Sequence, residues 1–141
     1  MRILVASLLA VMLMVSATGA KAEEKQAKLP FSKAVRVGNM LYLSGELGTV
    51  PGSLTLAQGG IGAETRQTME NIKATLEANG ATMDDVVKCF VMLADIGEWG
   101  AMNEVYRTYF SSRFPACSAM GAGGLALGAR VEIECMAEIK E

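Results

Sequence analysis

Two short runs near residue 40 alternate between apolar and polar side chains, and this alternation predicts a β-hairpin. The runs are residues 34–37 and 40–44, separated by Gly38-Asn39, a pair that tolerates the positive φ angles of a two-residue hairpin turn. The next stretch, residues 45–60, contains five glycines and Pro51 and has no sustained period. We therefore expect a long loop after the hairpin.

A helical period replaces the alternation after residue 60. One helix is predicted over residues 62–78, and Asn79-Gly80 supplies a typical helix end. A second helix is predicted before Pro115, which cannot continue it. The apolar stripe of the first helix comprises Thr65, Met69, Ile72 and Leu76, and that of the second comprises Trp99, Met102, Val105, Tyr106 and Tyr109.

Three further segments complete the predicted secondary structure. Residues 87–93 and 130–139 alternate like half-buried strands, and residues 116–120 form a short apolar run between them. Thr82 and Asp85 have the spacing of a capping box for one short turn. The order hairpin, helix, strand, helix, strand, strand predicts a two-layer α+β domain, a mixed sheet with both helices on one face. The other sheet face is left to water or to a partner subunit.

The first 22 residues have the pattern of a secretory signal peptide. Arg2 gives a short positive start, residues 3–17 carry no charge, and Ala20-Lys21-Ala22 matches the small-x-small site that signal peptidase cuts after. The apolar run of about 15 residues is shorter than the roughly 20 that a membrane-spanning helix needs, which argues against a permanent anchor. We therefore expect cleavage before Glu23 and export, most simply to the periplasm.

The mature chain is predicted to consist of a flexible polar leader, residues 23–29, and one domain, residues 30–141. Removing the signal takes away Arg2 and Lys21, so the 13 basic residues become 11 and the net charge becomes 11 − 15 = −4. With that charge and no basic run, counterion release cannot drive binding to nucleic acid, which we exclude as a partner. No other segment is apolar enough to hold the protein in a membrane after cleavage.

Absent residue types narrow the chemistry. The sequence has no histidine, which excludes Ser-His-Asp and Cys-His nucleophiles and every histidine-containing metal site. Cys89, Cys117 and Cys135 are too far apart for a C-x-x-C clip, and their odd number leaves at least one thiol unpaired within a chain. Cys89 and Cys135 lie on apolar strand faces, so we expect core packing, or a disulfide if their strands are neighbours. The glycine-rich run 121–124 precedes a strand rather than a helix, which excludes a dinucleotide loop.

The tail of the sequence carries a more specific signature. Pro115-Ala116-Cys117-Ser118-Ala119-Met120, followed by Leu125 and Val131-Glu132-Ile133, resembles the signature of the RidA/YjgF family of imine and enamine deaminases in residue type and spacing. Gly38-Asn39-Met40 leading into Leu43-Ser44-Gly45, and Asn103 in the second predicted helix, extend the resemblance over nearly all of the domain. One position departs from it, because the family's deaminases carry arginine where this chain has Cys117.

This resemblance implies a chorismate-mutase-like homotrimer with small-molecule clefts between subunits and the helices on the outside. It also implies hydrolysis of a small reactive imine or enamine to a keto acid and ammonia, without metal or organic cofactor. Glu132 would be the catalytic residue that helps to place the attacking water. The residues implied to bind the substrate are Phe31, where the family often has tyrosine, Ser44, Gly45, Asn103, Cys117 and Ala119.

The residue types suit that chemistry, and each also has a simpler interpretation. A glutamate in a partly desolvated cleft can have its pKa raised and carry protons, yet Glu132 shares its strand face with two other glutamates, as a solvated face would. Ser44 equally suits a strand-end hydroxyl, and Asn103 a helix-surface amide. The Cys117 thiol is either reactive or an inert filler, since no His or Lys neighbour is evident in the sequence to lower its pKa.

The arginine replaced by Cys117 matters because its planar fork holds a carboxylate through two charge-assisted hydrogen bonds. At roughly 1.5–3 kcal/mol for a hydrogen bond to a charged group, its loss weakens carboxylate substrates by about 10²–10⁴-fold unless another cation replaces it. Arg130 is close in the sequence, but nothing in the sequence places it in the cleft. Two hypotheses follow. One is a Rid-type deaminase in which Cys117 alters substrate choice; the other is a non-catalytic trimer that binds small metabolites or protects other proteins.

Overall fold

The structure is a computed structural model that describes residues 30–140, so the predicted signal peptide and leader lie outside the described residues. In chain order the strands and helices are β1 Ala34–Val37, β2 Met40–Leu43, β3 Glu46–Leu47, α1 Gly60–Ala78, β4 Val86–Leu93, α2 Trp99–Tyr106, β5 Ala116–Gly121 and β6 Val131–Glu138. Four single 3₁₀ turns lie between them, namely η1 Met83–Asp85, η2 Ile96–Glu98, η3 Arg107–Tyr109 and η4 Ala126–Gly128.

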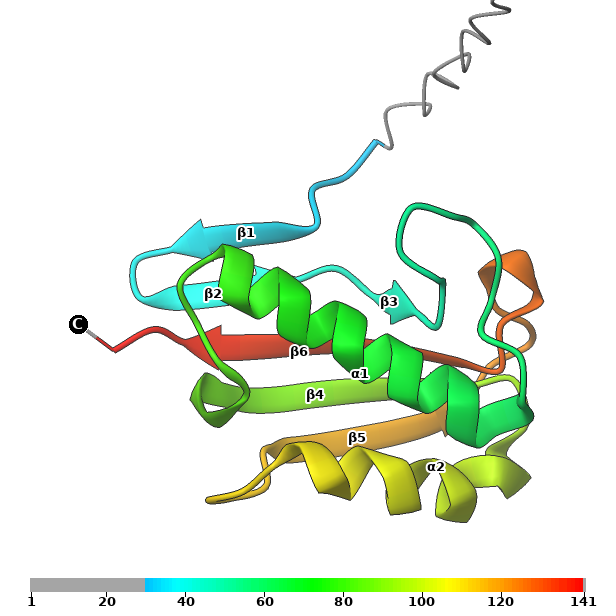
Figure 1. The fold of residues 1–141 in the computed structure, drawn as a ribbon. Helices are drawn as coiled ribbons and strands as arrows, with labels where there is room; N and C mark the ends of the chain where they lie inside the picture. Colours follow the sequence, from blue (N-terminus) through cyan, green and yellow to red (C-terminus); the bar gives the residue numbers. More distant parts are fainter. Residues whose placement is uncertain (1–29, 141) are drawn as a thin grey trace, which may run out of the picture.

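The strands form one mixed sheet in the order β1-β2-β6-β4-β5, with β3 pairing with β6 (Figure 1). β4 and β5 run parallel, whereas the other neighbours are antiparallel. Both helices lie on the same side of this sheet, α1 over β6 and beside α2 (Figure 1). The predicted two-layer α+β fold is therefore confirmed.

The core lies between the helices and the sheet, because alternate residues of each strand point toward the helices. The predicted apolar stripe of α1 is buried there, with Met69 and Ile72 0% exposed. Each such side chain contributes roughly 1.5–3 kcal/mol when fully buried, so the stripe determines which side of α1 faces the sheet. The stripe predicted for the second helix is only partly correct: Met102 and Tyr106 are buried, but Trp99 at the first turn is 52% exposed.

The hairpin and the short turn after α1 have the predicted local chemistry. Gly38 has a φ of +61°, which glycine adopts without steric cost, and Val37 pairs with Met40 across the two-residue turn. The Asn39 side chain donates a hydrogen bond to Glu138 at 2.9 Å, which ties the turn to the end of β6. The Asp85 carboxylate accepts from the backbone N–H of Thr82 at 2.8 Å, as expected of a capping box.

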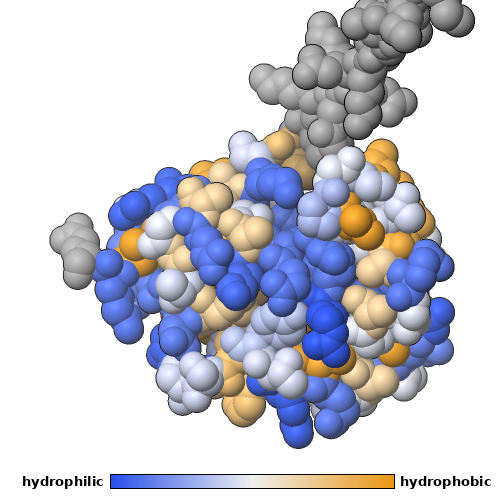
Figure 2. Space-filling model, in the orientation of Figure 1, coloured by the Kyte–Doolittle hydropathy of each residue, from blue (hydrophilic) through white to orange (hydrophobic). Residues whose placement is uncertain are grey.

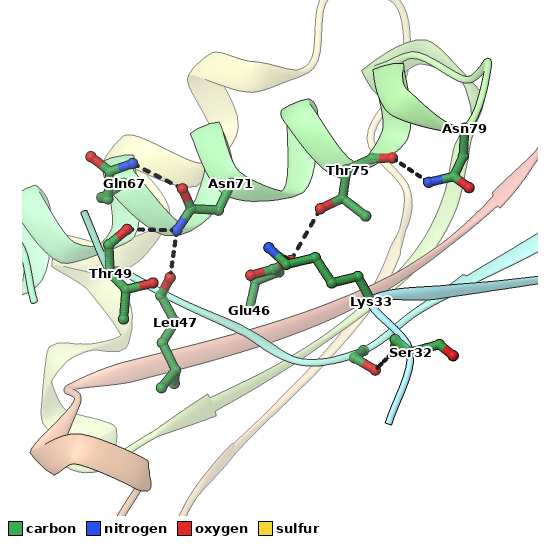
Figure 3. Close-up of polar contacts among 10 residues, drawn as sticks. Ser32, Lys33, Glu46, Leu47, Thr49, Gln67, Asn71, Thr75 and Asn79 are labelled. Atoms are coloured by element: carbon green, nitrogen blue, oxygen red, sulfur yellow. Dashed lines mark hydrogen bonds and ion pairs between the residues drawn. The ribbon is translucent and has the colours of Figure 1, made fainter. Parts of the chain in front are cut away.

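The loop predicted over residues 45–60 is more structured than expected, because it contains β3. Asn71 of α1 donates hydrogen bonds to the carbonyls of Leu47 and Thr49, both at 2.9 Å, and thereby holds β3 against the helix (Figure 3). Glu46, buried beneath the helix, accepts from the Thr75 hydroxyl at 3.1 Å and faces Lys33 at 3.6 Å (Figure 3). A two-residue strand has no period of its own, so its pairing with β6 is invisible in the local pattern.

The two strand cysteines at the centre of the sheet are joined by a disulfide. Cys89 on β4 lies directly opposite Cys135 on β6, with a Cα–Cα distance of 4.1 Å. The side chains are buried, with exposed fractions of 0% and 1%. Both expectations for these residues are therefore met. The two cysteines belong to the core, and they form a disulfide because their strands are neighbours.

The two faces of the domain expose different side chains. Figure 2 shows that the face over α1 is mostly hydrophilic, with scattered apolar patches. On the opposite side of the sheet, by the alternation of β1, β2 and β5, lie the exposed side chains of Val35, Val37, Tyr42 and Met120. Among the described residues no helix is long and apolar enough to cross a membrane.

Candidate active site

A cleft of about 710 Å³ opens between α2 and the edge strand β5. Asn103 enters it from α2, whereas Cys117 and Ala119 enter it from β5, where they alternate with residues that point away from the helices. Three of the seven predicted site residues therefore lie together. The residues that line the cleft are Ile96, Trp99, Asn103, Tyr106, Arg107, Phe114, Pro115, Cys117 and Ala119.

Cys117 is the free, exposed thiol of the described chain. It donates a weak hydrogen bond to the Ser118 carbonyl at 3.7 Å. Burial raises the pKa of Cys117, while the neighbouring Tyr106 hydroxyl and the Lys88 ammonium lower it to a smaller extent. Because the raising influence prevails, the side chain is a neutral thiol at neutral pH.

Tyr106 and Arg107 are cleft residues that sequence reasoning did not assign to the site. The Tyr106 hydroxyl is buried and has no hydrogen-bond partner in the described part of the chain, lying beside Cys117 but outside hydrogen-bond geometry. Burial raises the pKa of Tyr106, so the hydroxyl keeps its proton and can donate a hydrogen bond. Arg107 makes one ion pair in residues 30–140, an exposed contact with Glu104 at 3.9 Å that contributes little stability.

Arg130 forms an ion pair outside the cleft. Its guanidinium binds the carboxylate of Glu98 through Nε, at 3.1 and 3.2 Å, and through Nη2. That pairing raises the pKa of Arg130, and the side chain is not part of the cleft lining. Among the arginines of residues 30–140, Arg107 alone lines the cleft.

Glu132 belongs to a second group of predicted site residues, around the connection from β2 to β3. It is half-buried on β6 beside Leu47 of β3. Burial, and to a lesser extent the charge of Glu134, raises the pKa of Glu132. Gly45 is in direct contact with it, since a Cβ atom at residue 45 would lie 2.1 Å from Oε1 of Glu132. Only glycine leaves the carboxylate in this position.

Ser44 joins the start of the domain to this second group. Its hydroxyl donates to the carbonyl of Ser32 at 2.6 Å, and its backbone N–H donates to the carbonyl of Lys33 at 2.9 Å. Phe31, the residue before Ser32, is 57% exposed. Ser44 thus holds the segment that carries Phe31, in addition to any contact of its own with a ligand.

The two groups do not meet within one chain. Cys117 and Ala119 point toward the helix-covered side of β5 at one edge, because Cys117 is in register with the buried Cys89. Glu132 points to the opposite side of the sheet, because it alternates with the buried Val131 and Ile133. A single chain therefore presents two separate groups of predicted site residues, one rich in apolar and hydrogen-bonding groups and one with an acid.

The fold is that of the RidA proteins. RidA from an Antarctic Psychrobacter superposes with a TM-score of 0.76 at 41% sequence identity, covering 80% of this chain and 91% of that one. A structure from E. coli described as TdcF with bound serine superposes with a TM-score of 0.76 at 26% identity, over 81% and 91% of the two chains.

Sequence comparisons identify the family. The family model described as Endoribonuclease L-PSP matches residues 21–139. The goat (Capra hircus) protein named 2-iminobutanoate/2-iminopropanoate deaminase is 45% identical over 108 residues, which cover 77% of this chain and 79% of that protein. The chain belongs to the RidA/YjgF family.

Proposed function

We propose that this protein is an imine or enamine deaminase that releases ammonia from small reactive intermediates, and that it works as a homotrimer with each active site built from two copies. The observation that carries the proposal is the separation of the two groups of predicted site residues, which we call half-sites. The acid-bearing group lies around β3 and β6, and the cleft lies at the β5 edge on the other side of the sheet. Closing the exposed apolar sheet face against a second copy would bring the groups together.

Glu132 is suited to move the protons of imine hydrolysis. Water adds to the C=N carbon as its proton passes through the carboxylate to the nitrogen, which gives a carbinolamine. The hydroxyl proton of the carbinolamine then passes to the same nitrogen as the C–N bond breaks, leaving a carbonyl and ammonia. A carboxylate whose pKa is raised toward neutrality can both accept and return that proton. Gly45 keeps the carboxylate at this place, so we assign it a positioning role rather than a chemical one.

The cleft supports a substrate other than a simple small imino acid. Cys117 stands where the family's deaminases carry arginine, and its thiol is neutral. The cleft instead offers the Tyr106 hydroxyl, the Asn103 amide and apolar walls that include Trp99 and Phe114. We propose a neutral or amino-bearing imine as the preferred substrate, with weak turnover of 2-imino acids.

Imine chemistry is a better match than RNA cleavage, although the family description names an endoribonuclease. The sequence has no histidine for the usual acid–base pair and carries 15 acidic against 13 basic residues. Goat and human relatives are both named as imine deaminases. We therefore include RNA only as a comparison substrate in the test below.

Export to the periplasm, with cleavage after Ala22, is part of the proposal. Its support is the small-x-small pattern at residues 20–22 and the disulfide between Cys89 and Cys135, since disulfides persist in oxidising compartments. Mass spectrometry of the native protein is expected to find Glu23 at the N-terminus. An intact Met1 in the soluble fraction would contradict export by cleavage.

The test of the proposed activity is ammonia release from imines generated in situ, with and without a carboxylate, by wild-type protein and by Glu132→Gln. Turnover of neutral imines that depends on Glu132 supports the proposal. Equal, background-level release by both proteins, with retained binding of the same compounds, would favour the non-catalytic binding hypothesis. Cleavage of single-stranded RNA at a comparable rate would overturn the choice of substrate class.

A further inference from the structure

The three cysteines of the chain form a row across three neighbouring strands. Cys135 on β6 is in register with Cys89 on β4, and Cys89 is in register with Cys117 on β5. Residues in register on adjacent strands point to the same side of a sheet, so all three side chains face the helices. Cys89, the middle member, is disulfide-bonded to Cys135, and the free Cys117 lies on its other side.

This row differs from an ordinary buried disulfide in having one accessible member. Cys89 and Cys135 are 0% and 1% exposed, so a thiol in solution cannot reach either sulfur in the folded protein. Cys117 is exposed and lines the 710 Å³ cleft. Adjacent strands lie about 4.8 Å apart, within the Cα–Cα range of about 4.4–6.8 Å in which disulfides form.

We propose that Cys117 is a thiol–disulfide exchange site through which the buried Cys89–Cys135 disulfide equilibrates with small thiols in solution. The Cys117 thiolate attacks the sulfur of Cys89 from the side opposite Cys135. A Cys89–Cys117 disulfide forms, the Cys89–Cys135 bond breaks, and the proton lost by Cys117 is taken up by Cys135. The step is an isomerisation and needs no oxidant or reductant.

Reduction then proceeds from the cleft. A small external thiol attacks the Cys117 sulfur of the new disulfide, which releases Cys89 as a thiol and leaves a mixed disulfide on Cys117. A second external thiol regenerates Cys117 and departs as the oxidised reagent. In sum, two external thiols become one disulfide, and Cys89 and Cys135 become thiols, so electrons and protons balance.

The groups around Cys117 determine the rate of this exchange through the pKa of its thiol. Tyr106 and Arg107 line the same cleft from α2 and the turn after it. Lys88 of β4 lies on the other side of the sheet, where it donates a hydrogen bond to Ser118, and its charge lowers the pKa of Cys117 to a smaller extent than burial raises it. Because only the thiolate attacks, and burial keeps Cys117 protonated near neutrality, exchange accelerates as pH rises toward the thiol's raised pKa. The exchange also changes the cleft, because a Cys117 bonded to Cys89 no longer presents a free thiol there.

The experiment is native-state reduction of the oxidised protein by dithiothreitol, with timed acid quenching, alkylation and mass spectrometry. Wild type is compared with Cys117→Ser and with the matched control Ser118→Ala, which alters the neighbouring hydroxyl and keeps the thiol. We expect the Cys89–Cys135 bond of Cys117→Ser to be reduced at least about ten-fold more slowly than in the other two, with equal rates for all three in guanidinium. Equal native rates would overturn the proposal.

A second variant tests the geometry of the row. Cys135→Ala, held in a glutathione redox buffer, is expected to form the Cys89–Cys117 disulfide, which peptide mapping identifies directly. Folded Cys135→Ala with both remaining cysteines open to alkylation would contradict the proposed exchange. The kinetic comparison with Cys117→Ser decides the matter independently if Cys135→Ala does not fold, because residue 117 lies at an exposed strand edge.

Discussion

The two proposed half-sites of this protein are built in different ways. The β5 cleft is open, mainly apolar, and lined by a neutral thiol and an unpartnered tyrosine hydroxyl, whereas the Glu132 region is closely packed, with Gly45 in contact with the carboxylate. The first can vary without disturbing the core, because β5 is an exposed edge strand. The second cannot, because its neighbours pair with the central strand β6. Substrate choice is thus expected to change at the cleft while the proton-transfer group is retained.

The largest effect is expected from removing the charge of the acid half-site. Glu132→Gln keeps the size of the side chain but cannot accept a proton, so kcat for the best imine substrate should fall by about 10²–10⁴-fold. KM should change little, because the cleft half-site is untouched. Steady-state ammonia release measures both, and an unchanged kcat would remove Glu132 from the chemistry.

Cys117→Arg tests the other half-site, the cleft, by adding a group that binds carboxylates. Arginine restores a two-pronged carboxylate contact, and we expect kcat/KM for 2-iminobutanoate to rise about 10²-fold, whereas Cys117→Lys, which has the charge without the fork, should gain less. Adding Glu132→Ala should remove most of the gain. Wild-type rates already equal to those of Cys117→Arg would show that another cation, with Arg107 the first candidate, holds the carboxylate.

Gly45→Ala tests whether close packing positions the carboxylate. The added Cβ would lie 2.1 Å from Oε1 of Glu132, so the flexible end of that side chain must move. We expect roughly ten-fold lower kcat with a small change in Tm, because the displaced group is not backbone. The control is Gly100→Ala in α2, where a Cβ meets nothing within 4 Å and no loss is expected. Full activity in Gly45→Ala would contradict the positioning role.

The smallest effect concerns the pH profile. Burial raises the pKa of Glu132 first, and the charge of Glu134 raises it further, so the acid limb of activity should lie at higher pH than for an ordinary glutamate. Below this folded-state pKa the carboxylate is protonated and cannot act as base. Glu134→Gln removes the smaller influence and should move the acid limb to lower pH, whereas Glu138→Gln, on the same strand face, should not. An unmoved limb in Glu134→Gln would assign it to another group.

The parts of the fold that were predicted correctly are those with a period of their own. The alternation of β6 and the apolar stripe of α1 depend only on neighbouring residues, so the sequence predicts which side of each element is buried, and Val131 and Met69 are both 0% exposed. Trp99 was misplaced because it is the first residue of α2 and lines the open cleft rather than the core. The strand β3 was missed because two residues carry no period.

The candidate site was predictable only through family resemblance, and only in part. Asn103, Cys117 and Ala119 do share a cleft, but Tyr106 and Arg107 enter it because of the way α2 lies against β5, the next strand in the chain, and a local period does not show how two successive elements pack. Similarly, the alternation placed Cys89 and Cys135 on apolar faces, whereas their register and that of Cys117 arise from strand pairing. Pairing between distant strands is set by the whole sheet, not by local pattern.

The central claim is that one active site needs two copies of the chain, and subunit complementation tests it most directly. Glu132→Gln and Asn103→Ala, each damaged in a different half-site, are co-expressed with different affinity tags, and the mixed oligomer is isolated through both tags and its mass confirmed by light scattering. If each site takes one half from each of two copies, every mixed trimer holds one intact site out of three, and about a third of wild-type ammonia release should return. The account would be contradicted if mixed trimers containing both variants released no ammonia. It would also be contradicted if the wild-type protein were monomeric at micromolar concentration.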